Sequence, residues 1–199
     1  RESNKKIREQ LEGLSRDDFS EVFLFFDYDV HQTNLGKADD GDVIKQMLES
    51  FDNETENGKL YISYPMVEAL RDFKAGKCGD GDNCFVEISD LTEYKNISSK
   101  NSLNLHFRNY NIDVWKEIVD VFSMRISCLL GNAEVISYEQ YLDEANPHDI
   151  FICEQALAGN NKVFIISAFP EFLVDYFGMK LWRTCVKHAK NQLDICNCK

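Results

Sequence analysis

We predict an α/β protein with a central, mostly parallel sheet and a helical carboxyl-terminal lobe. Residues 22–26 are apolar and rich in aromatic and β-branched side chains, the composition of a strand buried on both faces of a parallel sheet. Strand and helix patterns alternate from there to residue 73, which favours parallel strands joined by right-handed crossovers. From residue 111 onward the apolar spacing is mainly helical.

The first part of the chain, residues 1–75, is predicted to form the α/β core. Apolar residues one helical turn apart predict a helix that ends near Gly13, and the strand at 22–27 follows. The apolar face of residues 43–51 predicts an amphipathic helix, and residues 60–63 a short strand. Pro65 stands where a first helical turn tolerates proline, so we expect a helix from there to Phe73.

The remainder is predicted to hold an insertion and a helical lobe. Residues 76–110 are rich in Gly, Asp, Asn and Ser and have little periodicity, which predicts an irregular insertion. In the lobe, residues 111–199, we expect a helix from Ile112 to Gly131, and a capping box of Ser137 and Gln140 that starts the next helix. The apolar segment 162–167 is expected to return to the sheet as a strand, followed by two more helices.

Charge and cysteine content limit the classes of function. The net charge of −12 over 199 residues argues against a protein that coats nucleic acid electrostatically, although metal ions can reverse the sign of a small acidic site. No membrane-length apolar run or signal peptide is visible, so we expect a cytoplasmic protein with no membrane partner. The seven cysteines are predicted to be reduced thiols, and the spacing of Cys78, Cys84, Cys196 and Cys198 disfavours zinc.

Two aspartates follow the apolar strand. Asp27 and Asp29 stand at its carboxyl end, where open α/β sheets bind ligands. Two such carboxylates repel each other unless a cation or a shared proton neutralises them, and Mg²⁺ or Mn²⁺ prefers oxygen ligands of this kind. Glu68 becomes a third acid of the site if the crossover brings the two strands together. The alternatives are an ordinary acidic strand exit for the aspartates and a favourable helix-dipole position for Glu68.

Three other residues are candidate substrate contacts. His31 follows the aspartates by two residues, Ser63 ends the second strand, and Arg71 lies in the segment after it, where it can meet a phosphate. For His31 and Arg71 the alternative is a solvated surface position.

The chain resembles a known family in this region. The segment 25–29, Phe-Phe-Asp-Tyr-Asp, with the later segment 63–70, Ser-Tyr-Pro-Met-Val-Glu-Ala-Leu, resembles the Toprim fold and more narrowly the Toprim-like proteins of the RloB and OLD type from bacterial anti-phage and abortive-infection systems. The similarity covers residues 21–73. It implies a Mg²⁺-dependent nuclease acting on DNA or RNA, with Asp27 and Asp29 as metal ligands and Glu68 as a further catalytic acid. The implied partner is an ATPase of the same defence system.

Two alternatives stay open. The apolar strand followed by Glu-Gly that opens Toprim folds is absent from the chain, which begins at Arg1 without a methionine. Either that strand lies upstream or a catalytic acid has been lost, and a loss favours a non-catalytic regulatory subunit with an acidic binding surface. Residues 27–30 also resemble the first motif of haloacid-dehalogenase-type phosphatases, with Asp27 as nucleophile and Ser167 and Lys180 as later motif residues. The choice of DNA or RNA, the trigger and homo-oligomer formation are not specified by the sequence.

Overall fold

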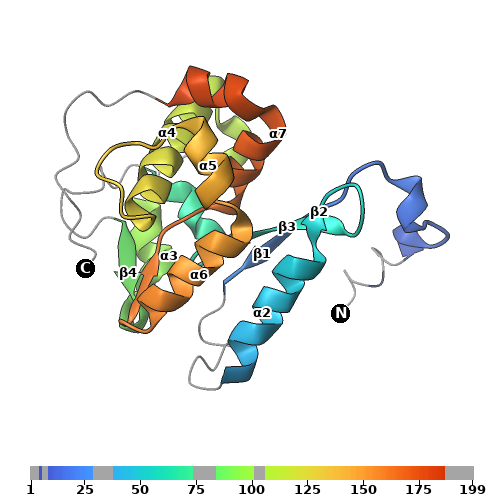
Figure 1. The fold of residues 1–199 in the computed structure, drawn as a ribbon, viewed down its shortest axis with the longest axis horizontal. Helices are drawn as coiled ribbons and strands as arrows, with labels where there is room; N and C mark the ends of the chain where they lie inside the picture. Colours follow the sequence, from blue (N-terminus) through green and yellow to red (C-terminus); the bar gives the residue numbers. More distant parts are fainter. Residues whose placement is uncertain (1–4, 6–8, 29–37, 74–83, 101–105, 187–199) are drawn as a thin grey trace.

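The computed structural model describes residues 5, 9–28, 38–73, 84–100 and 106–186 (Figure 1). Its strands are β1 (Phe23–Asp27), β2 (Asp52–Asn53), β3 (Gly58–Ser63), β4 (Phe85–Glu87) and β5 (Lys162–Phe164). Its α-helices are α2 (Ala38–Ser50), α3 (Leu91–Lys100), α4 (Ile112–Leu129), α5 (Tyr138–Glu144), α6 (Pro147–Ala158) and α7 (Ala168–Cys185). Short 3-10 helices are η1 (Arg16–Asp18), η2 (Val67–Arg71), η3 (Ile88–Asp90) and η4 (Phe107–Asn109). The protein is therefore a mixed α/β fold with a helical carboxyl-terminal region.

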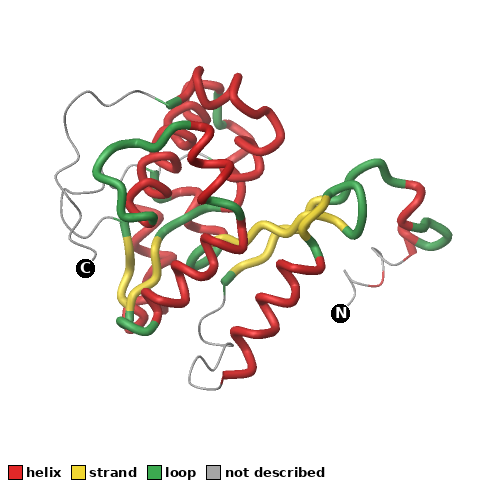
Figure 2. Tube along the Cα trace, viewed as in Figure 1, coloured by secondary structure: helices red, strands yellow, loops and turns green. Residues whose placement is uncertain are grey.

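Strands β1 and β3 form the predicted parallel pair, and α2 is the crossover between them. The register sets Phe23 beside Lys59 and Asp27 beside Ser63. The short strand β2 pairs antiparallel with the other side of β3, so the order is β1-β3-β2. The described sheet is therefore small and mixed, with β3 in the middle and β1 at an edge. Figure 2 shows the strands in yellow among the mostly helical elements.

The prediction that the first apolar strand is buried on both faces is wrong for β1. Phe25 and Phe26 are 39% and 47% exposed, whereas Leu60, Tyr61 and Ile62 of β3 are buried. Apolar composition states which side chains prefer burial, but it does not say whether a neighbouring strand lies on one side or on both. Here β3 has two neighbouring strands among the described residues and β1 has one.

Helices cover both faces of the β1–β3 pair. On one face the ring of Phe25 stacks on the ring of Tyr61, 5.7 Å between centroids, and on the ring of Phe169 of α7, 5.0 Å between centroids. On the other face Leu24 and Leu60 pack into the main core with residues of α2 and α6. Because strand side chains alternate between faces, the odd-numbered residues of β1 lie towards α7 and the even-numbered ones towards α2 and α6. Figure 1 shows α7 and α2 on either side of these strands.

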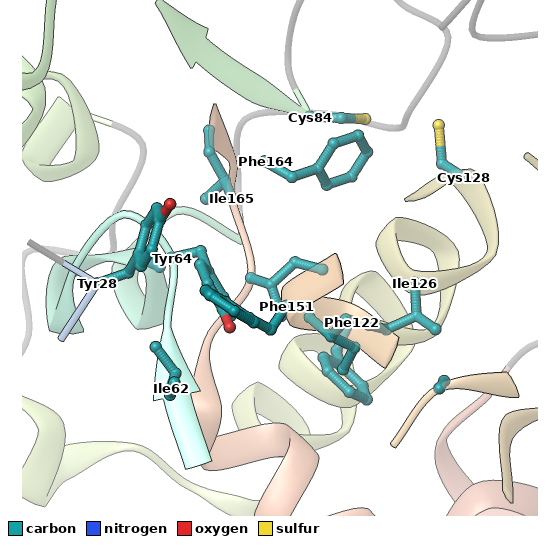
Figure 3. Close-up of a cluster of buried hydrophobic side chains, with 14 of the residues drawn as sticks. Tyr28, Ile62, Tyr64, Cys84, Phe122, Ile126, Cys128, Phe151, Phe164 and Ile165 are labelled. Carbon is teal, nitrogen blue, oxygen red and sulfur yellow. The ribbon is translucent and has the colours of Figure 1, made fainter. Parts of the chain in front are cut away.

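The main core joins the sheet to the helical region. Figure 3 shows Tyr28 and Tyr64 beside Phe151 of α6, with Phe164 and Ile165 next to them. The two tyrosine rings are 5.0 Å apart, centroid to centroid. An antiparallel bridge connects Tyr64 to Ile166 through two backbone hydrogen bonds of 2.7 and 2.9 Å.

The middle of the chain differs from its prediction. Residues 85–100, expected to be part of an irregular insertion, form β4, η3 and α3. Strand β5, expected to return to the β1–β3 sheet, instead pairs antiparallel with β4, with Phe85 opposite Phe164. The segment after β5 reaches the residue that follows β3 through the Tyr64–Ile166 bridge. Strand pairing joins segments far apart in sequence, so local periodicity did not reveal that β4 and β5 are partners.

The helices after residue 106 largely confirm the sequence analysis. Helix α4 begins at an Asn111 cap, and the Ser137–Gln140 capping box forms with two hydrogen bonds of 3.2 Å. The two last predicted helices are both present within α7, and they meet at Gly178, whose backbone is non-helical with a φ of 62°. Helix α6 was not predicted.

The α-helix predicted from Pro65 is wrong. The Tyr64–Pro65 peptide bond is cis and Met66 is extended, with a φ of −164°. A 3-10 helix follows, in which the Ala69 N–H donates to the Met66 carbonyl at 2.9 Å. Glu68 therefore lies in one short turn and not on the face of a longer helix.

Cys84 is in a disulfide bond, so the prediction that all seven cysteines are reduced thiols is wrong. Cys153 and Cys185 are free thiols.

Within the described ranges, no helix combines the length and the apolar character that crossing a bilayer requires.

Candidate functional site

Asp27 lies at the carboxyl end of β1, as predicted. It is exposed, and the next backbone N–H, that of Tyr28, donates to the Ser63 carbonyl at 2.9 Å. This bond holds β1 to β3 one residue beyond the strand. The side chains then separate by alternation, with Tyr28 buried on the α2 and α6 side and Asp27 on the α7 side. The structure thus brings Asp27 and Ser63 together at one end of a parallel pair.

Ser63 connects this strand end to helix α7. Its side chain is buried, and its hydroxyl oxygen accepts from the Ala168 N–H at 3.3 Å. The Ser167 hydroxyl accepts from the Phe169 N–H at 3.4 Å, and Pro170 has no N–H. The first donors of α7 are therefore used within the chain, and Ser63 has a structural role. The amino end of α7 thus lies at the same end of the β1–β3 pair as Asp27.

Glu68 and Arg71 contact other segments. A Glu68 carboxylate oxygen lies 3.1 Å from the Lys95 ammonium of α3, and the two side chains are 11% and 71% exposed, respectively. The Arg71 guanidinium lies over the Phe107 ring, 4.8 Å from its centroid. Glu68 thus already has a counter-ion, and Arg71 has an aromatic partner from η4.

Two predicted site residues, Asp29 and His31, lie outside the described residues. Within the part of the chain that is described, no group of three or more His, Cys, Asp or Glu side chains is arranged to hold a metal ion. The expected three-carboxylate site needs Asp29, so that site stays a prediction.

Glu154 of α6 is a buried acid that was not among the predicted site residues. Its side chain is fully buried, and one carboxylate oxygen accepts from the Phe164 N–H at 3.0 Å. The other oxygen has no hydrogen-bond partner in the described structure, and neither do the hydroxyls of Tyr28 and Tyr64. Burial raises the pKa of Glu154 well above its usual range. Burial, and then the charge of Glu154, raise the pKa of Tyr28 to about 12.

The position of Glu154 follows from the helix that contains it. Ile150 and Phe151 are buried on α6, and residues three and four positions apart share a helix face. The same face therefore carries Glu154 into the core. Recognising the Asn146 cap and Pro147 as a helix start would have indicated a buried acid.

A second polar cluster lies at the opposite end of β1 and β3. Asp175 of α7 accepts hydrogen bonds from the Lys59 ammonium at 2.5 Å, the Tyr61 hydroxyl at 3.0 Å and the Tyr141 hydroxyl at 2.9 Å. One turn earlier, Glu171 is buried, and burial followed by the charge of Asp175 raises its pKa. These bonds join β3, α5 and α7.

A hollow of about 390 Å³ lies beside this cluster. Its lining residues are charged or aromatic: Glu21, Phe23, Glu54, Lys59, Tyr61, Asp175 and Tyr176. Phe23 and Lys59 are register partners near the amino ends of β1 and β3, so the hollow and Asp27 lie at opposite ends of the strand pair.

The residues of the phosphatase alternative are far apart on one helix. Ser167 caps the start of α7, whereas Lys180 follows the interruption at Gly178 near its other end. At about 1.5 Å per helical residue, most of the helix length separates them.

Comparisons of the chain with models of protein families, with curated proteins and with solved structures found no match.

Proposed function

We propose that this protein is a Toprim-like, Mg²⁺-dependent nuclease that acts on DNA or RNA in the cytoplasm during bacterial anti-phage defence. The observation that supports the proposal best is the parallel β1–α2–β3 unit, which has Asp27 exposed at its carboxyl end beside Ser63. Ligand sites of open α/β sheets lie at this end of their strands. An ATPase of the same defence system is the partner that belongs to this proposal.

The donor set fits a magnesium ion. Mg²⁺ is commonly held by one or two carboxylates together with water and substrate phosphates. Asp27 supplies an exposed carboxylate, and Asp29 supplies a second by its place in the sequence two residues later. The metal, when bound, would polarise a phosphoryl oxygen and activate a water for attack. In this proposal Asp27 and Asp29 would hold the ion.

In this proposal Glu68 contributes after its ion pair opens. The Lys95 side chain is 71% exposed, but the Glu68 side chain is only 11% exposed, so opening the pair leaves a largely buried carboxylate without its counter-ion. A substrate phosphate would have to compensate the Lys95 ammonium, and Glu68 would then serve as the further acid that the resemblance implies.

The proposal is tested with Asp27→Asn and Asp29→Asn, which keep side-chain size and remove the charge. Cleavage of labelled DNA and RNA with Mg²⁺ should fall more than about 100-fold in each, because even partners of metal ligands cost about 10–100-fold. Calorimetry should show Mg²⁺ binding to the wild type that each variant weakens. Asp143→Asn, at an exposed position on α5, is the matched control. Wild-type cleavage by Asp27→Asn, or no Mg²⁺ binding by the wild type, would refute the proposal.

A further inference from the structure

The outer edge of β1 presents backbone hydrogen-bonding groups. The Val22 carbonyl accepts from the Lys59 N–H, and the Tyr28 N–H donates to the Ser63 carbonyl, each at 2.9 Å. The even-numbered residues of β1 thus direct their N–H and C=O groups towards β3. By the alternation of a parallel strand, Phe23 and Phe25 direct theirs away from it. No described strand pairs with this side of β1.

A row of aromatic rings continues from this edge onto α7. Phe25 contacts Phe172 at 5.5 Å between centroids, Phe172 contacts Phe23 at 4.8 Å, and Phe23 contacts Tyr176 at 6.0 Å. Tyr176 in turn contacts Phe177 at 5.1 Å, and these last two residues are 54% and 56% exposed. An open strand edge beside exposed aromatic side chains is typical of a surface that a partner covers.

The hollow beside Phe23 specifies the charge of that partner. Three carboxylates, Glu21, Glu54 and Asp175, line it with one ammonium, and that ammonium, Lys59, is already paired with Asp175. No ion pair among the described residues involves Glu21 or Glu54. The rings of Phe23 and Tyr176 complete the lining. Carboxylates combined with aromatic faces favour an ammonium or guanidinium group.

These features select one occupant. The open edge requires an extended chain, the aromatic row favours apolar side chains, and the hollow requires a cation. A second copy of this protein fits poorly, because two antiparallel β1 strands would bring the Glu21 end of each beside the Asp27 end of the other. Like charges across strands are destabilising, and each copy already carries a net charge of −12.

We propose that β1 receives an extended, basic peptide segment of a protein partner as an added strand. The segment carries apolar residues at alternate positions and places a Lys or Arg side chain in the hollow between Glu21 and Glu54. Strand addition uses main-chain hydrogen bonds for affinity and side-chain sites for specificity. The hollow lies at the end of β1 opposite Asp27, and peptide binding can be measured without metal, so the inference does not depend on nuclease activity.

The first test uses a fluorescent synthetic peptide, Lys-Val-Tyr-Val-Thr-Val-Arg, and fluorescence anisotropy in the presence of a chelator. Two N-methylated versions act as a matched pair, one methylated at the three valines and the other at the tyrosine and threonine. Only one set of N–H groups faces β1 in an added strand, so only one version should lose binding. Equal binding by the two versions, or no binding of the parent peptide, would overturn the proposal.

The second test concerns the hollow. Glu21→Lys should weaken binding of the parent peptide about tenfold at low salt, the equivalent of about 1.4 kcal/mol. Glu144→Lys changes the net charge equally at an exposed position on α5 and should have less than about a twofold effect. If Glu21→Lys and Glu144→Lys weakened peptide binding equally, the effect would come from the overall charge of the protein, and the hollow would not be the cation site. A wild-type dimer in light scattering that dissociates as the parent peptide is added would show that a second copy occupies the edge of β1, and it would likewise overturn the proposal.

Discussion

Replacement of Glu154 by glutamine is expected to change how the stability of the protein depends on pH. Glu154 is fully buried, and its only hydrogen bond in the described structure comes from the Phe164 N–H. Burial raises the pKa of this carboxyl well above its ordinary value of 4.5, and the Phe164 N–H lowers it by a smaller amount. In the folded protein the group therefore keeps its proton at pH values where the unfolded chain has lost it.

The size of the effect follows from proton linkage. Between the ordinary pKa and the raised one, the folded state binds one proton more than the unfolded state. The free energy of unfolding then falls by about 1.4 kcal/mol for each pH unit. This contribution to stability is fully present below about pH 4.5 and is lost as the pH rises through the folded-state pKa. Glutamine can still accept the Phe164 N–H and does not titrate, so Glu154→Gln removes this slope. The pKa of buried Glu171 is raised as well, but Glu171 is present in both the wild type and Glu154→Gln, so its effect on stability cancels when the two are compared.

The measurement is urea unfolding of wild type and Glu154→Gln at several pH values between about 5 and 8. As the pH rises from about 5, the unfolding free energy of the wild type should fall relative to that of the variant by about 1.4 kcal/mol per pH unit, until the pH reaches the folded-state pKa of Glu154. Glu144→Gln, at an exposed position, should run parallel to the wild type. If the unfolding free energies of the wild type and of Glu154→Gln changed in parallel with pH, the reasoning would be refuted. Glu154 would then ionise alike in the folded and unfolded states.

Three further predictions test other contacts through the free energy of unfolding in urea. Arg125→Met should cost about 3–5 kcal/mol, because the buried Arg125 guanidinium lies 4.0 Å from the Asp72 carboxylate and bonds its backbone carbonyl; a cost under about 1 kcal/mol would contradict this role. Asp175→Asn should cost about 3 kcal/mol, since hydrogen bonds to charged groups contribute about 1.5–3 kcal/mol each. Because Lys59 is a partner of Asp175, Lys59→Met should cost less in the Asp175→Asn protein than in the wild type. Ser137→Ala should cost about 1 kcal/mol by removing the α5 cap, and an unchanged stability would exclude that contribution.

The candidate site was only partly predictable. That Asp27 and Ser63 each end a strand was inferred correctly, because each directly follows an apolar run; that the two are register partners comes from the structure. The ion pair of Glu68 with Lys95 was not foreseen, because it joins η2 to α3 within a segment expected to be irregular. The burial of Glu154 was missed together with helix α6.

The sequence by itself determined the local elements: the apolar strands β1 and β3, the amphipathic helices α2 and α4, and the capping box before α5. Such elements depend on interactions between residues a few positions apart, and the spacing of apolar residues and the capping residues in the sequence indicate these interactions. Only the tertiary structure decided that β1 lies at an edge, that β4 pairs with β5, and that Asp175 joins Lys59, Tyr61 and Tyr141. These contacts join residues far apart in the chain, and their formation depends on which apolar surfaces pack together.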